Sequence, residues 1–258
     1  MARFRFAALA AALFVVAAGA FSFSVSAAYA FCTASQGSNS ATASSWAAGG
    51  QAGYNWQQGP FVYGIETDLS GTNLKSSMTG GLTQALGTCA NSTANTEANI
   101  DWYGTVRGRA GWTVDKVLFY GTGGLAYGKV DLNSNFNTAS LSLNSQTSSI
   151  RTGWVAGGGI AYMLLANVFL NLEYQYVDLG TATLAASTAN GTWNIGQIAS
   201  AHAQFSVVTA GLSWRFSPAD TAPQGLAAKP WEGVYFGGHA GGAWGNSTNA
   251  NYSSQFIF

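Results

Sequence analysis

Apolar and polar residues alternate along successive runs of roughly ten residues between positions 46 and 216. The run after Pro60 shows this most clearly, because Phe61 and Tyr63 fall on one face while Glu66 and Asp68 fall on the other. A period of two residues predicts β-strands whose two faces differ in polarity. We therefore expect a series of strands, each with one apolar, aromatic-rich face and one polar face.

The alternation predicts seven strands whose connections are short and long in turn. The predicted strands cover residues 45–57, 61–68, 100–112, 117–129, 151–163, 168–179 and 202–216. Tight turns are expected at 58–60, 114–116 and 165–167. Long loops rich in Ser, Thr and Asn are expected at 71–99, 130–150 and 180–200. Outer-membrane β-barrels distribute short periplasmic turns and long extracellular loops in this way.

The composition favours a barrel surrounded by lipid. Charged residues make up 8% of the chain, against about 25% in an average soluble domain. After residue 30, no unbroken apolar stretch reaches the roughly 18 residues that a spanning helix needs. A closed barrel satisfies its own backbone groups in lipid and fits both observations. The chain also has no basic run, so we expect no nucleic acid among its partners.

The first 30 residues have the features of a secretory signal peptide. Arg3 and Arg5 precede a long apolar stretch that ends in the small-x-small sequence at 28–30. The alternative is an uncleaved helical anchor. Export would bring Cys32 and Cys89 into an oxidising compartment, where a disulfide between them is expected and two free thiols are the alternative.

An eighth strand is needed, because bacterial single-chain barrels have an even number of strands. The barrel domain predicted at 31–216 supplies seven. A Pro-containing periplasmic linker follows at 217–230, and residues 231–245 have the length and the Gly and aromatic content of a further strand. We expect residues 246–258 to form an exposed tail.

Several sequence blocks resemble the small outer-membrane β-barrel surface antigens of alpha-proteobacteria, which are also described as porin-like or opacity-type proteins. The blocks, in chain order, are GGQAGYNW at 49–56, YGIETD at 63–68, YGTVRGRAG at 103–111, YGTGGLAYG at 120–128, GWVAGGG at 153–159 and GLSWRF at 211–216. The resemblance implies an eight-stranded antiparallel transmembrane β-barrel in the bacterial outer membrane. It implies no established catalysis.

The chain departs from the family in the position of one strand. Family members open with a Trp-x-Gly-x-Tyr-x-Gly strand, whereas here its counterpart lies at 231–237. We therefore expect a circularly permuted barrel in which residues 231–245 fill the place of the first family strand. The alternative is that these residues are the remnant of a second, tandem barrel.

The predicted inward faces carry charges of both signs. The inward charges are Glu66, Asp68, Asp101, Arg107, Arg109, Glu173 and Arg215. An eight-stranded barrel has an interior only wide enough for side chains, so these groups should form a network of ion pairs. A narrow ion path gated by rearrangement of the pairs is the alternative, and a proton-relay or hydrolytic role ranks below it.

The sequence indicates a structural outer-membrane protein that contributes to envelope integrity and presents extracellular loops. A small passive pore is the second hypothesis, and a lipid-modifying enzyme is the third. Catalysis by a nucleophile and a base would have to use His202 or His239, and neither has a local acidic partner in the sequence. We expect no enzyme activity, no cofactor and no metal. Expected partners are outer-membrane lipid, lipopolysaccharide and the barrel-assembly machinery, with host or phage proteins as contacts of the loops.

Overall fold

The computed structural model describes residues 32–34, 41–84, 93–137, 142–189, 194–216, 229–247 and 251–257. These segments contain ten β-strands. The strands are β1 (Cys32–Ala34), β2 (Ala41–Gln58), β3 (Phe61–Gln84), β4 (Thr93–Val114), β5 (Val117–Asn137), β6 (Ser142–Leu165), β7 (Val168–Ala189), β8 (Asn194–Phe216), β9 (Gly233–Ser247) and β10 (Asn251–Ile257). The described segments contain no helix that is long and apolar enough to cross a membrane.

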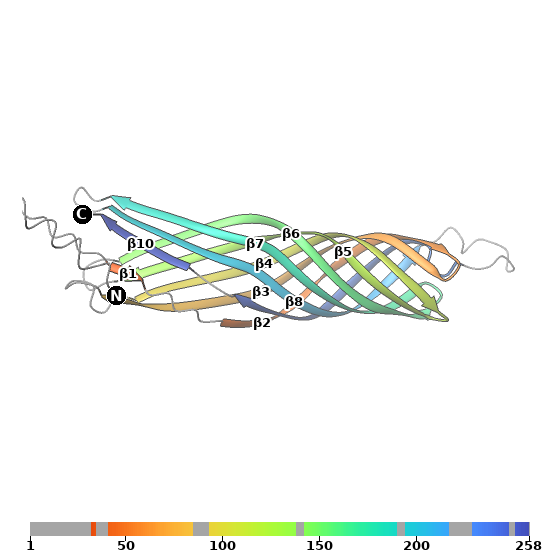
Figure 1. The fold of residues 1–258 in the computed structure, drawn as a ribbon. Coiled ribbons are helices and arrows are strands. Elements are labelled where there is room, and N and C mark those ends of the chain that lie inside the picture. The colour runs from red at the N-terminus through yellow and green to blue at the C-terminus, as the bar shows by residue number, and fades with distance from the viewer. Residues whose placement is uncertain are drawn as a thin grey trace, which may run out of the picture.

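Eight of the strands form a closed antiparallel ring (Figure 1). Each strand from β2 to β8 pairs with the next one in the chain, and β9 pairs with both β8 and β2. Closure leaves the ring without a free edge, as the lipid environment requires. The predicted all-β, eight-stranded antiparallel barrel is confirmed.

Strand β9 closes the ring between the first and the seventh of the predicted strands. Its pairs run from Asn55↔Gly233 to Ala41↔Ser247 on β2, and from Phe216↔Val234 to Phe205↔Gly245 on β8. The segment at 231–245 therefore contributes a strand to this barrel. That its place results from a circular permutation of the family order stays a prediction.

Two further strands lie together at one end of the barrel (Figure 1). Strand β10 pairs with the first seven residues of β8, and β1 pairs with the last three residues of β3. The predicted tail at 246–258 thus includes a paired strand. Cys32 opposes Gln84 in the register of β1 and β3, while Cys89 lies outside the described residues, so the predicted disulfide stays a prediction.

The short turns lie at the predicted places, but the long polar stretches are mostly strand. Strands β3 and β4 extend through the loop expected at 71–99, and leave only residues 85–92 undescribed between them. Strands β5 to β8 extend in the same way through the loops expected at 130–150 and 180–200. The loop prediction at these stretches is wrong because a polar composition does not exclude strands. Thr favours strands, and antiparallel neighbours satisfy the backbone of polar hairpins as well as that of apolar ones.

The extended strands divide the barrel into two halves along its axis. Strands β3 to β8 have 21 to 24 residues each, whereas a spanning strand needs about 9–11. We call the part next to the short turns the membrane half and the remainder the outer half.

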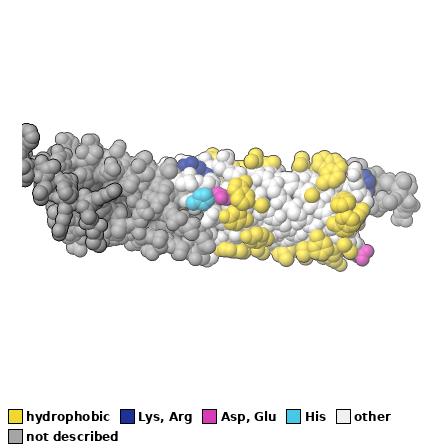
Figure 2. Space-filling model, in the orientation of Figure 1, with side chains coloured by type: hydrophobic (Ala, Val, Ile, Leu, Met, Phe, Trp, Pro, Cys, Tyr) yellow, Lys and Arg dark blue, Asp and Glu magenta, His cyan; other side chains and the backbone are white. Residues whose placement is uncertain are grey.

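The outer surface of the membrane half is apolar and bordered by aromatic side chains. Hydrophobic side chains gather over the described barrel wall in Figure 2, with the visible charged groups towards its two ends. Aromatic residues near the short turns include Trp56, Phe61, Tyr63, Trp112, Phe119, Tyr162, Trp214, Phe216 and Phe236. A second set, at the other boundary, includes Trp102, Tyr127, Trp154, Tyr174, Tyr176 and Trp244. An apolar band between two aromatic girdles is the membrane-facing surface of an outer-membrane barrel.

Candidate functional site

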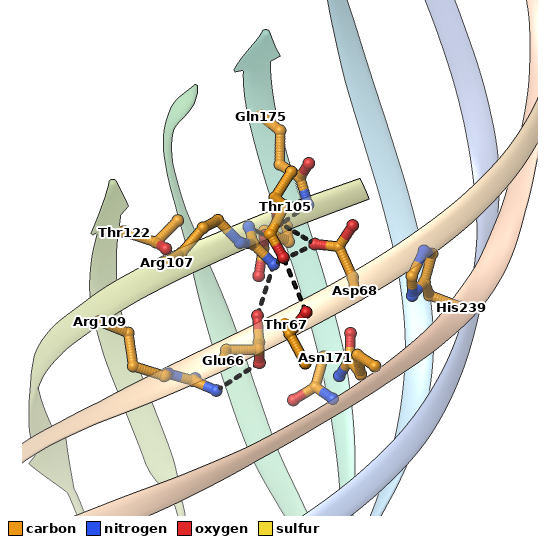
Figure 3. A network of polar contacts seen from close by, with 12 residues as sticks. Glu66, Thr67, Asp68, Thr105, Arg107, Arg109, Thr122, Asn171, Gln175 and His239 are labelled. Carbon is orange, nitrogen blue, oxygen red and sulfur yellow. Dashed lines mark hydrogen bonds and ion pairs between the residues drawn. The ribbon is translucent and has the colours of Figure 1, made fainter. Parts of the chain in front are cut away.

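A network of buried ion pairs fills the lumen of the membrane half, and Arg107 lies at its centre (Figure 3). Its Nη2 atom lies 2.5 Å from Glu66 Oε1 and 2.9 Å from Asp68 Oδ2, and its Nη1 atom donates to Glu173 Oε1. Only 2% of Arg107 is exposed. One guanidinium group thus joins two carboxylates of the neighbouring strand β3 to one carboxylate of β7, which lies across the lumen.

Arg109 and two tyrosines extend the network towards the short turns. Arg109 Nη1 lies 3.2 Å from Glu66 Oε2 and donates to the hydroxyl of Tyr235 at 3.0 Å. That hydroxyl donates in turn to Glu66 Oε2 at 2.5 Å. The Arg109 guanidinium also lies 3.9 Å from the centre of the Tyr120 ring, whose hydroxyl donates to Glu173 at 2.6 Å. Each carboxylate of the network therefore has more than one hydrogen-bond donor.

The β-sheet register explains why these side chains meet. Glu66 on β3 directly opposes Arg107 on β4, and Asp68 opposes Thr105, whose hydroxyl donates to Asp68 Oδ2 at 2.6 Å. On the other side, Arg107 opposes Gly124 of β5. A Cβ at Gly124 would lie 2.7 Å from Arg107 Cα and still closer to the carbonyl oxygen of Val106. Glycine at this position lets the strand bearing Arg107 approach closely.

Apolar layers close the lumen on both sides of the ion pairs. Towards the outer half lies a cluster of buried residues that includes Tyr103, Leu132, Leu179 and Phe205. Tyr103 and Phe205 meet edge to face across the lumen with their ring centres 5.1 Å apart. Towards the short turns lies a second cluster, of Val62, Leu118, Tyr120, Ala161, Phe169 and Trp231. The charged layer is thus enclosed between two apolar ones.

Five of the seven predicted lumen charges meet in this network, and two do not. Arg215 is buried nearer the short turns, where it donates to the carbonyl oxygens of Ala166 and Glu232 at 2.9 Å each. Asp101 lies outside the lumen network: its side chain is 42% exposed and pairs with Lys129 at 3.4 Å. The cause is a β-bulge between Ile100 and Trp102, which reverses the facing expected from strict alternation.

The sequence did not identify several polar partners of the network. Tyr120 lies in a Gly-rich strand whose facing the pattern did not resolve, and Tyr235 lies in β9 across the barrel. His239 also faces the lumen, where its Nε2 atom lies 2.8 Å from the hydroxyl of Ser70. It is buried, with 9% of its surface exposed. Every second residue of a strand faces the same side, and this rule would have placed these residues in the lumen if it had been extended through the glycines of their strands.

His202 has an acidic partner that the sequence did not reveal. Its Nε2 atom lies 3.2 Å from Asp178 Oδ2 and its Nδ1 atom lies 3.1 Å from the hydroxyl of Thr181. Asp178 and Thr181 flank a bulge in the pairing of β7 with β8, at which Gly180 has a φ of 74°. The sequence shows no acidic partner close to either histidine along the chain, and the partner of His202 comes instead from the neighbouring strand.

The connection from β8 to β9 ends in an ion pair close to the barrel mouth. Lys229 Nζ donates to Glu232 Oε2 at 2.8 Å, and the backbone N–H of Gln57 donates to the same carboxylate. This hydrogen bond between the two side chains lowers the pKa of Glu232 and raises the pKa of Lys229. Trp231, which precedes Glu232 in the chain, packs on Phe169 inside the barrel with ring centres 4.7 Å apart.

Comparison with known proteins agrees with the closed ring and its apolar, girdled exterior, which define a bacterial outer-membrane β-barrel. A family model described as an outer membrane protein beta-barrel domain matches residues 6–216. The chain belongs to this family, and its place is the outer membrane of a bacterium.

Relatives confirm the resemblance to alpha-proteobacterial surface antigens. The chain is 38% identical over 150 residues to a 31 kDa outer-membrane immunogenic protein of Brucella melitensis, covering 57% of this chain and 60% of that protein. It is 37% identical over 134 residues to a 22 kDa outer membrane protein of Rhizobium leguminosarum, covering 50% of this chain and 52% of that protein. The chain thus spans little more than half the length of these relatives.

Among solved structures, Ail of Yersinia pestis aligns with 80% of this chain and 97% of its own. The sequence identity is 12% and the TM-score is 0.24, which is too low to bear on function. In the described part of the chain, no group of three or more His, Cys, Asp or Glu side chains is arranged to hold a metal ion.

Proposed function

We propose that the protein is a sealed structural barrel that contributes to envelope integrity and presents paired β-hairpins beyond the outer membrane. The observation that carries this proposal is the enclosure of the Arg107 network between two apolar layers. An ion crossing the lumen would have to leave water at both layers, and burial of an unpaired charge in apolar surroundings is strongly unfavourable. The enclosure therefore favours a closed barrel over a passive pore.

The outer half supports the second part of the proposal. Its strands carry exposed polar residues well past the outer aromatic girdle, for example Asn73, Lys75 and Ser77 on β3. Such hairpins are available to lipopolysaccharide sugars, host proteins or phage. The Brucella relative is named an immunogenic protein, and surface hairpins of this kind suit recognition by antibodies.

Conductance of purified, refolded protein in planar bilayers tests the sealed barrel. A general diffusion porin in the same bilayers serves as the positive control, and heat-modifiable gel mobility verifies that the barrel is folded. We expect no discrete steps from the protein. Discrete, reproducible steps from folded protein would overturn the proposal in favour of the pore.

Surface presentation is tested in intact cells with a peptide tag between β5 and β6 and a matched tag in the turn at Asp115-Lys116. Antibody should label the first tag without permeabilisation and the second only after it. The reverse pattern would contradict the proposed orientation.

We propose that the protein is not an enzyme, although Thr181, His202 and Asp178 have the residue types of a hydrolytic triad. The same bulge that brings them together directs the backbone N–H of Gly180 to Asp178 Oδ1 at 2.8 Å. Acyl transfer needs hydrogen-bond donors aimed at a developing oxyanion. The backbone N–H of Gly180 is not aimed at a substrate, because it donates to Asp178. The cluster fits a brace for the bulge. Replacement of His202 by Ala should leave the lipid A and phospholipid composition of the cells unchanged, and altered lipids would overturn this assignment.

A further inference from the structure

A small cavity lies in the lumen of the membrane half, between the ion-pair network and the apolar layer near the short turns. It offers about 20 Å³ to the centres of water-sized molecules, and its wall includes Asn55, Arg109, Phe169, Arg215, Trp231 and Tyr235. One water molecule needs about 10–15 Å³ on this scale. The cavity therefore has room for a monatomic ion or one to two waters, and not for a larger polyatomic ligand.

Two hydrogen-bond donors in the wall of this cavity have no partner within the protein. They are the indole Nε1 of Trp231 and the Nε of Arg109, whose residues are only 3% and 7% exposed. An unsatisfied buried donor costs about 1–3 kcal/mol, and more when it is charged. Such groups in native structures usually have a bound water or ion. The wall thus calls for a ligand that accepts hydrogen bonds.

The distribution of charge in the lumen favours a negative ligand here. The buried side chains of the described residues include three carboxylates, of Glu66, Asp68 and Glu173, and three guanidinium groups, of Arg107, Arg109 and Arg215. All three carboxylates converge on Arg107. Glu66 also pairs with Arg109, at 3.2 Å. The cavity wall includes both Arg109 and Arg215 and none of these three carboxylates, so the side chains that border the cavity are neutral or positive.

We propose that this cavity is a binding site for a monatomic anion, with chloride as the natural occupant. The ion accepts hydrogen bonds from Trp231 Nε1 and Arg109 Nε, and it is attracted by the two guanidinium groups. Phe169 and Ala161 close the apolar side. The amide oxygen of Asn55 has no partner inside the protein. A half-turn of this amide about χ2 turns the oxygen away from the ion and presents the –NH2 group, which donates to it. The ion thereby links Arg109 of the ion-pair network to Trp231 of the apolar layer near the short turns.

Crystals of the detergent-purified protein grown in sodium bromide test the site directly. We expect an anomalous peak between Arg109, Arg215 and Trp231. Density without anomalous signal at that position would identify the occupant as water and overturn the proposal. Anomalous peaks confined to the protein surface would overturn it equally.

A solution experiment tests whether the anion contributes to the fold. A ligand that binds only the folded state raises its stability with concentration, so bromide or chloride in place of gluconate at equal ionic strength should raise the thermal unfolding midpoint by about 2–4 °C. Trp231→Phe keeps the packing on Phe169 and removes the N–H donor, so the halide-dependent rise should shrink at least by half. Trp214→Phe, on the lipid-facing surface, is the matched control and should keep the full rise. An equal midpoint in halide and gluconate, or an equal rise in both variants, would contradict the site.

Discussion

The membrane half and the outer half of the barrel have opposite polarity, although the same strands run through both. In the membrane half the exterior is apolar and the lumen holds ion pairs. In the outer half the lumen is filled by Leu132, Leu179 and their neighbours, while exposed outward positions carry residues such as Lys75 and Asn95. The surroundings of the barrel, lipid in one half and water in the other, therefore determine which face of a strand is apolar. The period of two residues is the same in both halves.

The point of inversion is marked by irregular pairing. Bulges interrupt the ladder between Gly71 and Leu74, between Ile100 and Trp102, and between Asp178 and Thr181. All three lie close to the outer aromatic girdle. A bulge adds one residue and changes which face a side chain takes, so it lets a strand exchange its polar and apolar faces without a break in the barrel.

The largest expected effect comes from removing the centre of the polar lumen. Arg107→Leu leaves three buried carboxylates without their shared cation and should destabilise the barrel by about 3–5 kcal/mol. Urea unfolding of the barrel in lipid vesicles, followed by tryptophan fluorescence, measures this. Adding Asp68→Asn and Glu173→Gln to the variant should recover part of the loss, because the uncompensated charge is then reduced.

Lys129→Gln is the control for Arg107→Leu, because its ion pairs with Asp101 and Asp131 lie at a partly exposed position in the outer half. Partly exposed pairs contribute only about 0–1 kcal/mol. Equal losses in the two variants would mean that the lumen of the membrane half is hydrated, and would contradict the difference between the halves.

An intermediate effect is expected from a charge placed on the outward face of β4. Val106 lies between the aromatic girdles and is 53% exposed at the barrel surface. Val106→Arg should cost about 2–4 kcal/mol, the range for Arg near the middle of the bilayer. Asn95→Arg, on the same strand in the outer half, should change stability by no more than about 0.5 kcal/mol. A similar loss of stability in the two variants would show that the boundary between the membrane half and the outer half does not lie at the outer aromatic girdle.

Much of the membrane half could be predicted from the sequence, because lipid imposes a strict period of two. The facing of Phe61, Tyr63, Glu66 and Asp68 and the positions of the three short turns follow directly from it. The strands of the outer half are harder to predict from the sequence. Inward residues such as Leu132 alternate there with polar ones, but sparsely, and Ser, Thr and Asn occur in strands and loops alike.

Contacts that depend on ring closure could not be predicted from local patterns. Arg107 meets Glu66 through adjacent strands, yet its bond to Glu173 spans the lumen between β4 and β7. The exit of Asp101 from the lumen depends on a single bulged position. The sequence therefore identified the charged inward set, while its pairing scheme required the three-dimensional register.

The smallest expected effect concerns the barrel mouth, where water reaches the ion pair of Glu232 with Lys229. The pKa of Glu232 is lowered in the folded state by the hydrogen bond from Lys229. Its contribution to stability is therefore complete above the ordinary glutamate pKa of about 4.3 and is lost as the pH falls through the lower folded-state value. Glu232→Gln should unfold at a slightly lower temperature than the unmodified protein at pH 6, and the difference should vanish at about pH 3. Lys229→Met should show the same dependence, because it removes the other partner. A difference in unfolding temperature that grows as the pH falls would have the wrong sign for a carboxylate stabilised as an anion. It would show that groups other than this ion pair, inside the barrel, determine the pH dependence.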